Sequence, residues 1–285
     1  MSYDHWQGKS FGENCNSKNQ IKLLETFQIV PTDAPPAGFL PRGSLYLSFT
    51  FTLEGPYMSK DDRPFHSAIK RDDDKKNVLS ENPMRREWAF WVPMVSGSTW
   101  KGNIRSAALA LTQTEANKKD WGKHVENLFG PRMEKENDEL ENPRQGRVQF
   151  FPTYFGKIAQ DIINPRNRTK RTGTNPIQME QVPPGEKGRF ALLYVPFDLL
   201  HLPDEKLRRA KDLRLLGTSI AATLRESGFG GKKTLPNHGT AKEEFLESVI
   251  LADEYGVIKN GLIKEEGTLE ASNLWKLPEF AKRNA

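Results

Sequence analysis

The chain contains the stretch Val92-Pro-Met-Val-Ser-Gly-Ser-Thr-Trp-Lys-Gly-Asn-Ile-Arg105, which leads from an apolar run into a helical pattern. Apolar residues recur at helical spacing, and the predicted buried face carries Ile104, Ala107, Ala108 and Leu111. Ser96 or Ser98 is placed to cap the first turn, since a hydroxyl oxygen accepts a hydrogen bond from an unpaired backbone N–H there. The stretch therefore predicts a helix that begins in a run of small hydroxyl residues.

The start of this helix is a candidate anion-binding site. Its first backbone N–H groups are unpaired and the helix dipole is positive there, so phosphate is a natural ligand. Ser98 and Thr99 lie at this start, and Lys101 and Arg105 are spaced to share one helical face. The Gly-Lys-Ser/Thr order of a P-loop is absent. An ordinary capped helix explains the same residues, so this segment alone leaves both interpretations open.

Alternating and apolar segments outside this stretch predict the strands. Ser44–Leu53 alternates polar residues with aromatic and aliphatic ones, which is typical of a strand. Further strands are predicted at Arg147–Phe151, Phe190–Phe197 and Phe245–Leu251. The second of these is almost wholly apolar and is expected to be central in its sheet.

A second helix is predicted over Glu205–Glu226, where apolar residues stand near helical spacing at Leu207, Leu213, Leu216, Ile220 and Leu224. Ser227-Gly-Phe-Gly-Gly-Lys-Lys233 ends this helix abruptly. Strands and helices then follow one another in the order β–α–β–β–α–β. That order predicts an α+β fold of the ferredoxin-like type.

The remaining segments set the predicted domain organisation. Residues 1–40 are expected to form an N-terminal arm, 41–252 one domain, and 253–285 a C-terminal extension. Within the domain, 55–96 is expected to be a loop insertion. Its part from Tyr57 to Arg86 is strongly charged, and an exposed loop without a packed element is predicted there.

The glycine-rich segment Gly228-Phe-Gly-Gly231 precedes Lys232 and Lys233. It follows a helix rather than a strand, so it does not fit the dinucleotide-binding fingerprint. Glycines still allow a backbone to come close to a polyanion, with the two lysines beside it. A plain helix end and turn is the alternative interpretation.

Composition excludes several classes of protein. The chain has 285 residues with 16 Phe, 6 Trp and 6 Tyr, enough for a sizeable core. It shows neither a long apolar run nor an apolar N-terminal segment, so neither a transmembrane helix nor a secretory signal is expected. Cys15 is the single cysteine and the histidines are scattered, so no disulfide framework and no metal site is predicted from spacing. These features indicate a cytoplasmic protein.

The distribution of charge is more informative than its sum. The formal net charge is +5, which many soluble proteins carry. Arg166, Arg168, Lys170 and Arg171 form a run without acidic residues, and Glu205–Lys233 is also rich in basic residues. Such patches favour contact with a polyanion.

Taken in order, these segments resemble the RAMP superfamily of CRISPR effector proteins. Val92–Arg105 is similar to the family signature Ile-Pro-Gly-Ser-Ser-x-Lys-Gly-x-x-Arg. Further matching segments follow in the family's order at Leu128-Phe-Gly130, Gly146–Phe151, Arg171-Thr-Gly173, Glu180–Gly185 and Gly228–Gly231. The resemblance covers residues 44–251 and implies a modified RNA-recognition-motif fold with long loop insertions, of which residues 55–96 would be thumb-like.

Within the superfamily, the loop between the first strand and the first helix resembles that of backbone subunits of type III effector complexes. Those subunits carry an Asp-x-Pro motif whose Asp cleaves target RNA with a divalent metal. Asp61-Asp62-Arg63-Pro64 stands at this place, and Asp62 matches best by its spacing to Pro64. The resemblance thus implies Asp62 as the catalytic residue, with Asp61 as second candidate, and Mg²⁺ as cofactor.

The resemblance implies a subunit of a type III CRISPR RNA-guided effector complex, a cytoplasmic ribonucleoprotein of antiviral defence. Its partners would be guide RNA (crRNA), target RNA and other effector subunits, with no membrane. The residues expected at RNA are Ser98, Thr99, Lys101, Arg105, Arg166, Arg168, Lys170, Arg171, Gly228, Gly230, Gly231, Lys232 and Lys233. Two alternatives stay open: a non-catalytic scaffold of the same complex, or a stand-alone endoribonuclease that processes guide RNA through a histidine, with His66 as its candidate.

Overall fold

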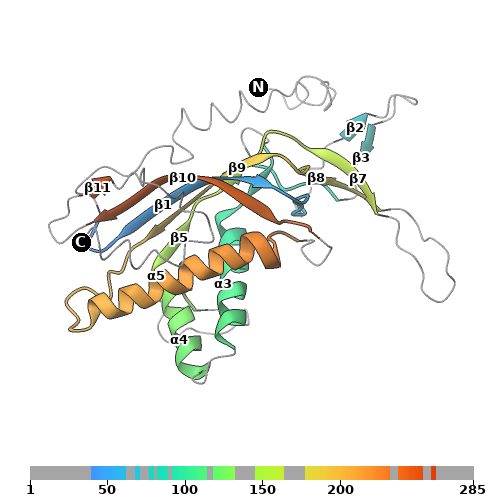
Figure 1. Cartoon of the computed structure of the whole chain (residues 1–285). Helices are drawn as coiled ribbons and strands as arrows, with labels where there is room; N and C mark the ends of the chain where they lie inside the picture. The colour runs from blue at the N-terminus through green and yellow to red at the C-terminus, as the bar shows by residue number, and fades with distance from the viewer. Residues whose placement is uncertain are drawn as a thin grey trace.

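A computed structural model describes residues 40–61, 68–70, 77–79, 82–88, 92–113, 118–131, 145–163, 177–231, 237–252 and 258–260. At its centre is a five-stranded antiparallel sheet in the order β11-β10-β1-β9-β5 (Figure 1). Its strands are β1 (Leu45–Leu53), β5 (Val148–Phe150), β9 (Lys187–Tyr194), β10 (Ala241–Ala252) and β11 (Ile258–Asn260). The four predicted strands are present, and β9 lies inside the sheet between β1 and β5, as expected.

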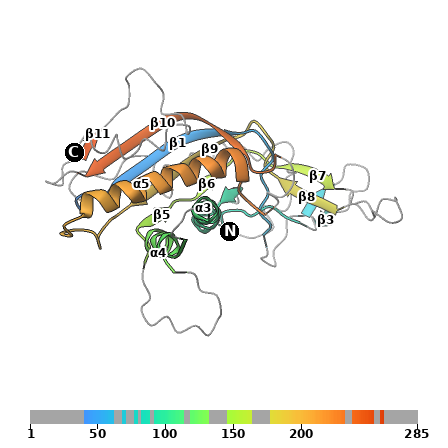
Figure 2. The ribbon, with the colours of Figure 1, turned by 60° about the horizontal axis from the view of Figure 1, so that its bottom comes forward.

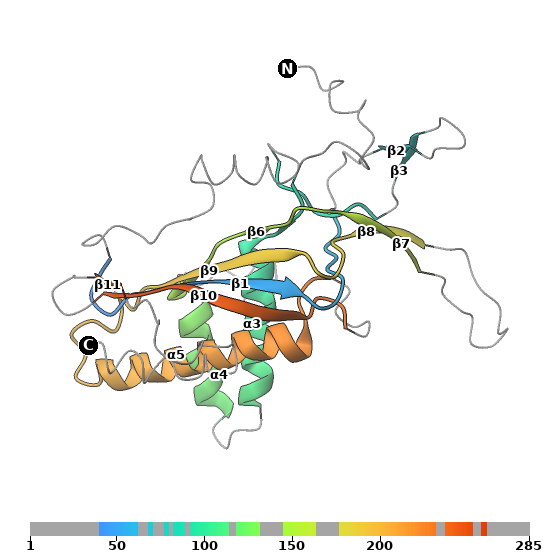
Figure 3. The same ribbon diagram turned by 45° about the horizontal axis from the view of Figure 1, so that its top comes forward.

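Helices cover one face of this sheet (Figure 3). They are α3 (Gly97–Thr112), α4 (Lys118–Phe129) and α5 (Glu205–Ala222), the last continued by the π-helix η1 (Thr223–Ser227). Figure 2 shows α5 lying along the sheet while α3 and α4 are seen end on. The elements that correspond to the predicted ones follow in the order β1–α3–β5–β9–α5–β10, which is the predicted β–α–β–β–α–β order, and α4 and the short strands β2–β4 and β6–β8 lie between them in the sequence. The α+β fold is confirmed.

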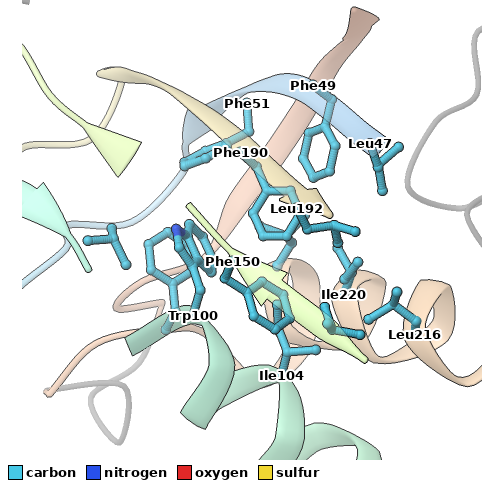
Figure 4. Close-up of a cluster of buried hydrophobic side chains, with 14 of the residues drawn as sticks. Leu47, Phe49, Phe51, Trp100, Ile104, Phe150, Phe190, Leu192, Leu216 and Ile220 are labelled. Carbon is cyan, nitrogen blue, oxygen red and sulfur yellow. The ribbon is translucent and has the colours of Figure 1, made fainter. Parts of the chain in front are cut away.

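The core lies between the sheet and the helices, because side chains alternate across a strand. Leu47, Phe49 and Phe51 of β1 point toward α3 and α5, together with Phe190 and Leu192 of β9 (Figure 4). Phe49 stacks on Phe190, its neighbour across the strands, with ring centroids 4.9 Å apart. Aromatic contacts of this kind add stability beyond the area that they bury.

One residue of the predicted buried face is exposed, and so is one apolar residue of the second predicted helix. Leu111 is 37% exposed, because the buried face of α3 passes through Ala108 to Thr112, whose hydroxyl donates to Ala108 O at 2.9 Å. Leu207 is 74% exposed, because it lies on the opposite side of α5 from the buried Leu216 and Ile220. After Glu205, the next buried residue of α5 is Asp212.

The segment from Tyr57 to Arg86, predicted as an exposed loop, is in part packed against the rest of the chain. Backbone bridges join Tyr57 to Val182, Lys60 to Met84 and Arg86 to Pro93. The short strands β4 (Met94–Val95) and β6 (Thr153–Tyr154) then pair with each other. We call residues 57–61, 82–87, 92–95, 153–155 and 179–182 the bridge region. Its buried residues include Tyr57, Met58, Met84 and Arg86, so the exposed-loop prediction is wrong here.

Two further pairs of strands lie beyond one end of the main sheet (Figure 3). They are β2 (Ala68–Lys70) with β3 (Asn77–Leu79), and β7 (Ala159–Ile163) with β8 (Ile177–Gln181). The predicted arm lies outside the described residues except for Leu40, and so does the predicted C-terminal extension except for β11. Among the helices described, none is long and apolar enough to cross a membrane.

Candidate nucleic-acid interface

Ser96 caps α3, as one of the two predicted caps. Its Oγ accepts a hydrogen bond from Thr99 N at 3.1 Å and lies 2.8 Å from Ser98 Oγ and 2.9 Å from Thr99 Oγ1. The first turn of α3 carries no acidic residue, and Ser98 is exposed. The positive end of the helix dipole is therefore surrounded by hydroxyl groups, an arrangement that suits an anion.

Gly97 and Trp100 attach this helix start to the sheet. A Cβ atom at Gly97 would collide with Phe150 O, so glycine is required for α3 to come this close to β5. Trp100 is fully buried, and its Nε1 donates to Thr153 Oγ1 at 3.0 Å. The hydroxyl groups of Ser96, Ser98 and Thr99 are thus held in place by the core.

Lys101 and Arg105 lie in the first two turns of α3 and are both partly exposed. Burial, followed by the charge of Arg105, lowers the pKa of Lys101. The two cations are thus close enough to repel each other. An anion site at these two residues stays a prediction.

The glycine-rich segment packs beside the start of α3. Gly228 and Gly230 have φ values of +66° and +103°, which side-chain-bearing residues rarely adopt. Phe229 between them is buried, and its ring centroid lies 4.4 Å from that of Trp100. The two motifs that the sequence singled out separately are therefore neighbours.

Contacts within the chain explain why glycine is required at Gly228 and Gly230. A Cβ atom at Gly230 would press on Met58 O, and one at Gly228 would collide with His238 O. Gly231 N donates to Met58 O at 2.8 Å. The close approach that the sequence suggested for a polyanion is made here by the chain's own backbone, and RNA contact at these glycines stays a prediction.

Asp61 lies at the edge of the bridge region, where its N donates to Pro83 O at 2.9 Å. It is 5% exposed and lines a cleft of about 540 Å³. The residues lining this cleft are Lys60, Asp61, Arg85, Arg86, Glu87, Trp88, Met94 and Tyr154. Asp62, the better match to the family motif, lies outside the described residues.

The described residues of the cleft beside Asp61 do not provide a complete set of ligands for the divalent metal that the resemblance implies. In the part of the chain that the structure describes, Asp61 and Glu87 are the carboxylates that line the cleft. Among the described residues, no three His, Cys, Asp or Glu side chains are grouped to hold a metal ion. The described part of the cleft thus offers carboxylate chemistry but does not by itself form a metal centre.

Several predicted site residues lie outside the described residues. Arg166, Arg168, Lys170 and Arg171 belong to the segment between β7 and β8, and Lys232 and Lys233 follow the glycine-rich segment. His66 also lies outside the described residues. Trp88 is 56% exposed and lines the cleft beside Asp61.

A buried polar network on the helix side of the sheet was not predicted from the sequence. Arg147 binds both oxygens of Asp198, from Nε at 2.7 Å and Nη2 at 2.8 Å, and its Nη1 donates to Asp212 Oδ2 at 2.7 Å. Tyr194 also donates to Asp212 Oδ2, at 2.7 Å. The signal available was an acidic residue, Asp212, in the apolar part of a predicted helix.

His124 extends this network. Its Nε2 lies 3.2 Å from Asp212 Oδ1. Burial, followed by the charges of Lys211, Arg147 and Arg208, lowers the pKa of His124 to about 4. Burial and these positive charges outweigh the nearby Asp212 carboxylate, which is itself bound by Arg147. The network joins α4, α5 and the sheet and is accounted for by packing.

Among the solved structures that resemble the chain are three of type III CRISPR complexes. A chain of the type III-B Cmr-beta structure bound to cognate target RNA matches with a TM-score of 0.46 and 14% identity. The match covers 82% of this chain and 66% of the Cmr-beta chain, so this chain spans just under two thirds of the length of that chain. A chain of the Csm3-Csm4 subcomplex of the type III-A CRISPR-Cas interference complex matches with a TM-score of 0.42 and 16% identity, over 85% and 96%. A chain of type III-B Cmr-beta in the apo state matches with a TM-score of 0.44 and 10% identity, over 73% and 98%. No curated protein sequence matches.

The sequence itself matches one family model. The match runs over residues 54–235, which is more than half of the chain, and the model is that of the RAMP superfamily. The matched segment includes the cleft beside Asp61, the capped start of α3 and the glycine-rich segment. The chain therefore belongs to the RAMP superfamily.

Proposed function

We propose that the chain is a subunit of a type III CRISPR RNA-guided effector complex, in which it binds guide RNA and aligns target RNA. Family membership supports this role, as does the resemblance of the Asp61–Pro64 loop to type III backbone subunits. The observation that carries the proposal is the pair Lys101 and Arg105, two partly exposed cations beside a capped helix start. The glycine-rich segment lies against the same helix start through Phe229 and Trp100.

The expected contacts are to the RNA backbone. Lysine and arginine bind phosphates without reading sequence, so one subunit can hold any guide. A helix start with Ser98 and Thr99 adds backbone N–H and hydroxyl donors. Because bound phosphates release counterions, affinity should fall steeply with salt.

The test measures guide RNA binding to the purified full chain at several salt concentrations. Nucleic acid that co-purifies, seen in the absorbance ratio, is the first expected result. Lys101→Ala and Arg105→Ala should each weaken binding and reduce the slope of log K against log salt by about 1. Lys123→Ala and Arg214→Ala are matched controls, because both residues are exposed and lie on other helices. Equal losses in all four variants would contradict a specific role for α3.

Target cleavage at the Asp loop is the second part of the proposal. Cleavage through the 2′-hydroxyl needs in-line geometry, and a carboxylate can assist as proton acceptor or metal ligand. Asp62 has the family spacing, and Asp61 beside it is mostly buried. Asp62→Ala in the assembled complex with Mg²⁺ should abolish a cut in labelled target RNA and leave target binding unchanged.

An unaltered cleavage pattern in Asp62→Ala would contradict the catalytic assignment, and Asp61→Ala would be tested next. If neither variant changes cleavage, or if the complex cuts no target, the scaffold alternative is the better description. The endoribonuclease alternative predicts that the isolated chain cuts a guide precursor without metal and that His66→Ala stops it.

A further inference from the structure

The side of α5 that faces away from the sheet is basic. Both acidic residues of this helix, Glu205 and Asp212, are buried. Its exposed charged residues are Lys206, Arg208, Lys211 and Arg214. Every exposed charge of α5 is therefore positive. Figure 2 shows this helix at the surface, lying along the sheet with α4 beside it.

The buried acids of α5 are bound from inside the chain and do not balance these cations. Glu205 Oε2 accepts a hydrogen bond from Arg42 Nη2 at 2.6 Å, and Asp212 Oδ2 accepts one from Arg147 Nη1 at 2.7 Å. Such pairs use up the charge of each carboxylate. The positive charge on the outer side of α5 is thus left for a partner outside the chain.

Lys211 and Arg214 have no acidic partner among the described residues, whereas Arg208 Nε pairs with Asp204 at 2.7 Å. Lys211 Nζ lies 4.0 Å from the centroid of the Trp121 ring on α4. A cation held over an aromatic ring keeps its charge and loses some of its freedom. Lys211 is therefore partly ordered before any partner binds, which lowers the entropic cost of binding.

Exposed aliphatic side chains lie at the first turn of the same helix. Leu207 is 74% exposed and Leu202 is 39% exposed. Leu202 is joined to the helix start, since Glu205 N donates to Leu202 O at 3.1 Å. Leu207, Lys211 and Arg214 follow at intervals of four and three residues, which places them on one side of the helix. We call Leu202, Leu207, Lys211 and Arg214 the α5 surface.

A second helix with matching side chains would fit this surface. Packed helices meet through residues three and four positions apart, the spacing of Leu207, Lys211 and Arg214. Apolar side chains form the core of a protein interface and charged ones its rim. We propose that the α5 surface docks an acidic amphipathic helix of a protein partner. Its apolar side chains would contact Leu202 and Leu207, and its carboxylates would pair with Lys211 and Arg214.

The composition of the α5 surface favours this partner over three others. RNA phosphates bind cations and hydrogen-bond donors, so they leave Leu202 and Leu207 without a contact. A second copy of α5 would bring like charges together. A lipid surface takes up the apolar side of a helix, and that side of α5, with Leu216 and Ile220, is already buried against the sheet.

The test measures binding of a labelled, designed helical peptide to the full chain by fluorescence anisotropy. The peptide carries leucine and glutamate at the spacing of the α5 surface, and a scrambled peptide of the same composition should bind about tenfold more weakly. The double variant Lys211→Glu with Arg214→Glu should lower the affinity for the designed peptide by about tenfold. Leu207→Ala should lower it by about fivefold, as expected for the loss of one apolar contact.

A charge swap makes the test specific. A peptide with lysine in place of each glutamate should bind the double variant and not the wild-type chain, which also shows that the variant is folded. The matched control is Lys123→Glu with Lys242→Glu, because both lysines are exposed and lie on α4 and β10. This control changes the net charge equally and should leave peptide binding unchanged.

Three results would overturn the inference. The scrambled peptide binds as well as the designed one, the charge swap fails, or the control weakens binding equally. The inference is also wrong if a short RNA of arbitrary sequence, or a phosphatidylserine vesicle, binds through Lys211 and Arg214 and the designed peptide does not. Guide RNA binding should be unchanged in the double variant, so this inference and the proposed function can fail separately.

Discussion

Trp100 and Arg86 are the two largest fully buried side chains among the described residues, and they lie in different regions. Trp100 stands in the sheet-and-helix core, where its ring meets those of Phe190 at 5.0 Å and Phe229 at 4.4 Å. Arg86 stands in the bridge region, where its charge is balanced by Glu180 at 2.8 Å. One region buries an indole among rings, and the other buries an ion pair.

The two regions therefore differ in what their buried side chains contribute. Trp100 contributes mainly to stability, whereas the Arg86–Glu180 pair selects one pairing of the segments around it. Apolar burial stabilises in proportion to the area removed from water, whichever side chains share it. A buried ion pair gains little net free energy but penalises every arrangement that separates its partners. Glu180 Oε2 accepts from both Arg86 Nη2 and Met84 N, at 2.8 and 2.9 Å. We infer that the pair fixes which residues of the bridge region lie opposite each other beside the cleft.

The largest expected effect is that of Trp100→Ala. Removing a buried indole leaves a cavity and should lower the free energy of unfolding by about 4 kcal/mol. Thr153 Oγ1 also loses its donor. Urea unfolding measures the change, and Trp88→Ala is the control, expected within about 0.5 kcal/mol because Trp88 is exposed. Equal losses in the two variants would contradict the distinction between the regions.

The core could be predicted from the sequence because its signals are periodic. Ser44–Leu53 alternates over enough residues to identify β1, and Glu205–Glu226 repeats apolar residues long enough to identify α5. An error arose at Leu207, which belongs to the list of apolar residues but lies on the exposed side of α5, opposite Leu216 and Ile220. A list of apolar residues thus identifies a helix more readily than it identifies which residues of that helix are buried.

The bridge region could not be predicted in the same way. Its pairings, such as that of Lys60 with Met84, are single bridges between segments distant in sequence. A pairing of one residue has no period, and a buried Arg86 looks in the sequence like any charged loop residue. The site was therefore found only in part: the start of α3 was predicted, whereas the cleft at Trp88 required the structure.

The second prediction concerns the loss of the ion pair between Arg86 and Glu180. Glu180→Ala removes the carboxylate that pairs with the buried Arg86 at 2.8 Å and should lower the free energy of unfolding by about 3 kcal/mol. Glu186→Ala is the matched control, because Glu186 pairs at 3.2 Å with Lys157, whose side chain is 69% exposed. Exposed pairs contribute about 0–1 kcal/mol.

Hydrogen exchange locates the effect of Glu180→Ala. Loss of amide protection should concentrate in the bridge region, for example at Val182 N, which donates to Tyr57 O at 2.8 Å. The double variant Arg86→Met with Glu180→Leu should recover most of the stability, since it removes both charges. Protection lost uniformly over β1 and β9 would contradict a separate stability of the bridge region.

The third prediction concerns the polar network inside the core. Between pH 6.5 and about 4 the unfolded chain binds a proton at His124 that the folded chain does not, so stability should fall as the pH falls through this range. The loss should be on the order of 2 kcal/mol. Asp212, whose pKa burial raises, contributes with the opposite sign. His124→Gln removes only the histidine contribution, so stability in that variant should fall less over the same range; identical pH profiles would contradict the assignment.

The smallest expected effect lies at Ser96, where the bridge region passes into the core. Ser96 directly follows β4 and caps α3, with Oγ 3.1 Å from Thr99 N. Ser96→Ala should lower the free energy of unfolding by about 1 kcal/mol, because the first turn loses its acceptor. Ser96→Asp should retain most of the stability, and Ser106→Ala, on the exposed side of the same helix, should be close to neutral. If Ser96→Ala reduces exchange protection in α3 but not at Val182, the two regions are separable at this residue; loss in both would show that the cap couples them.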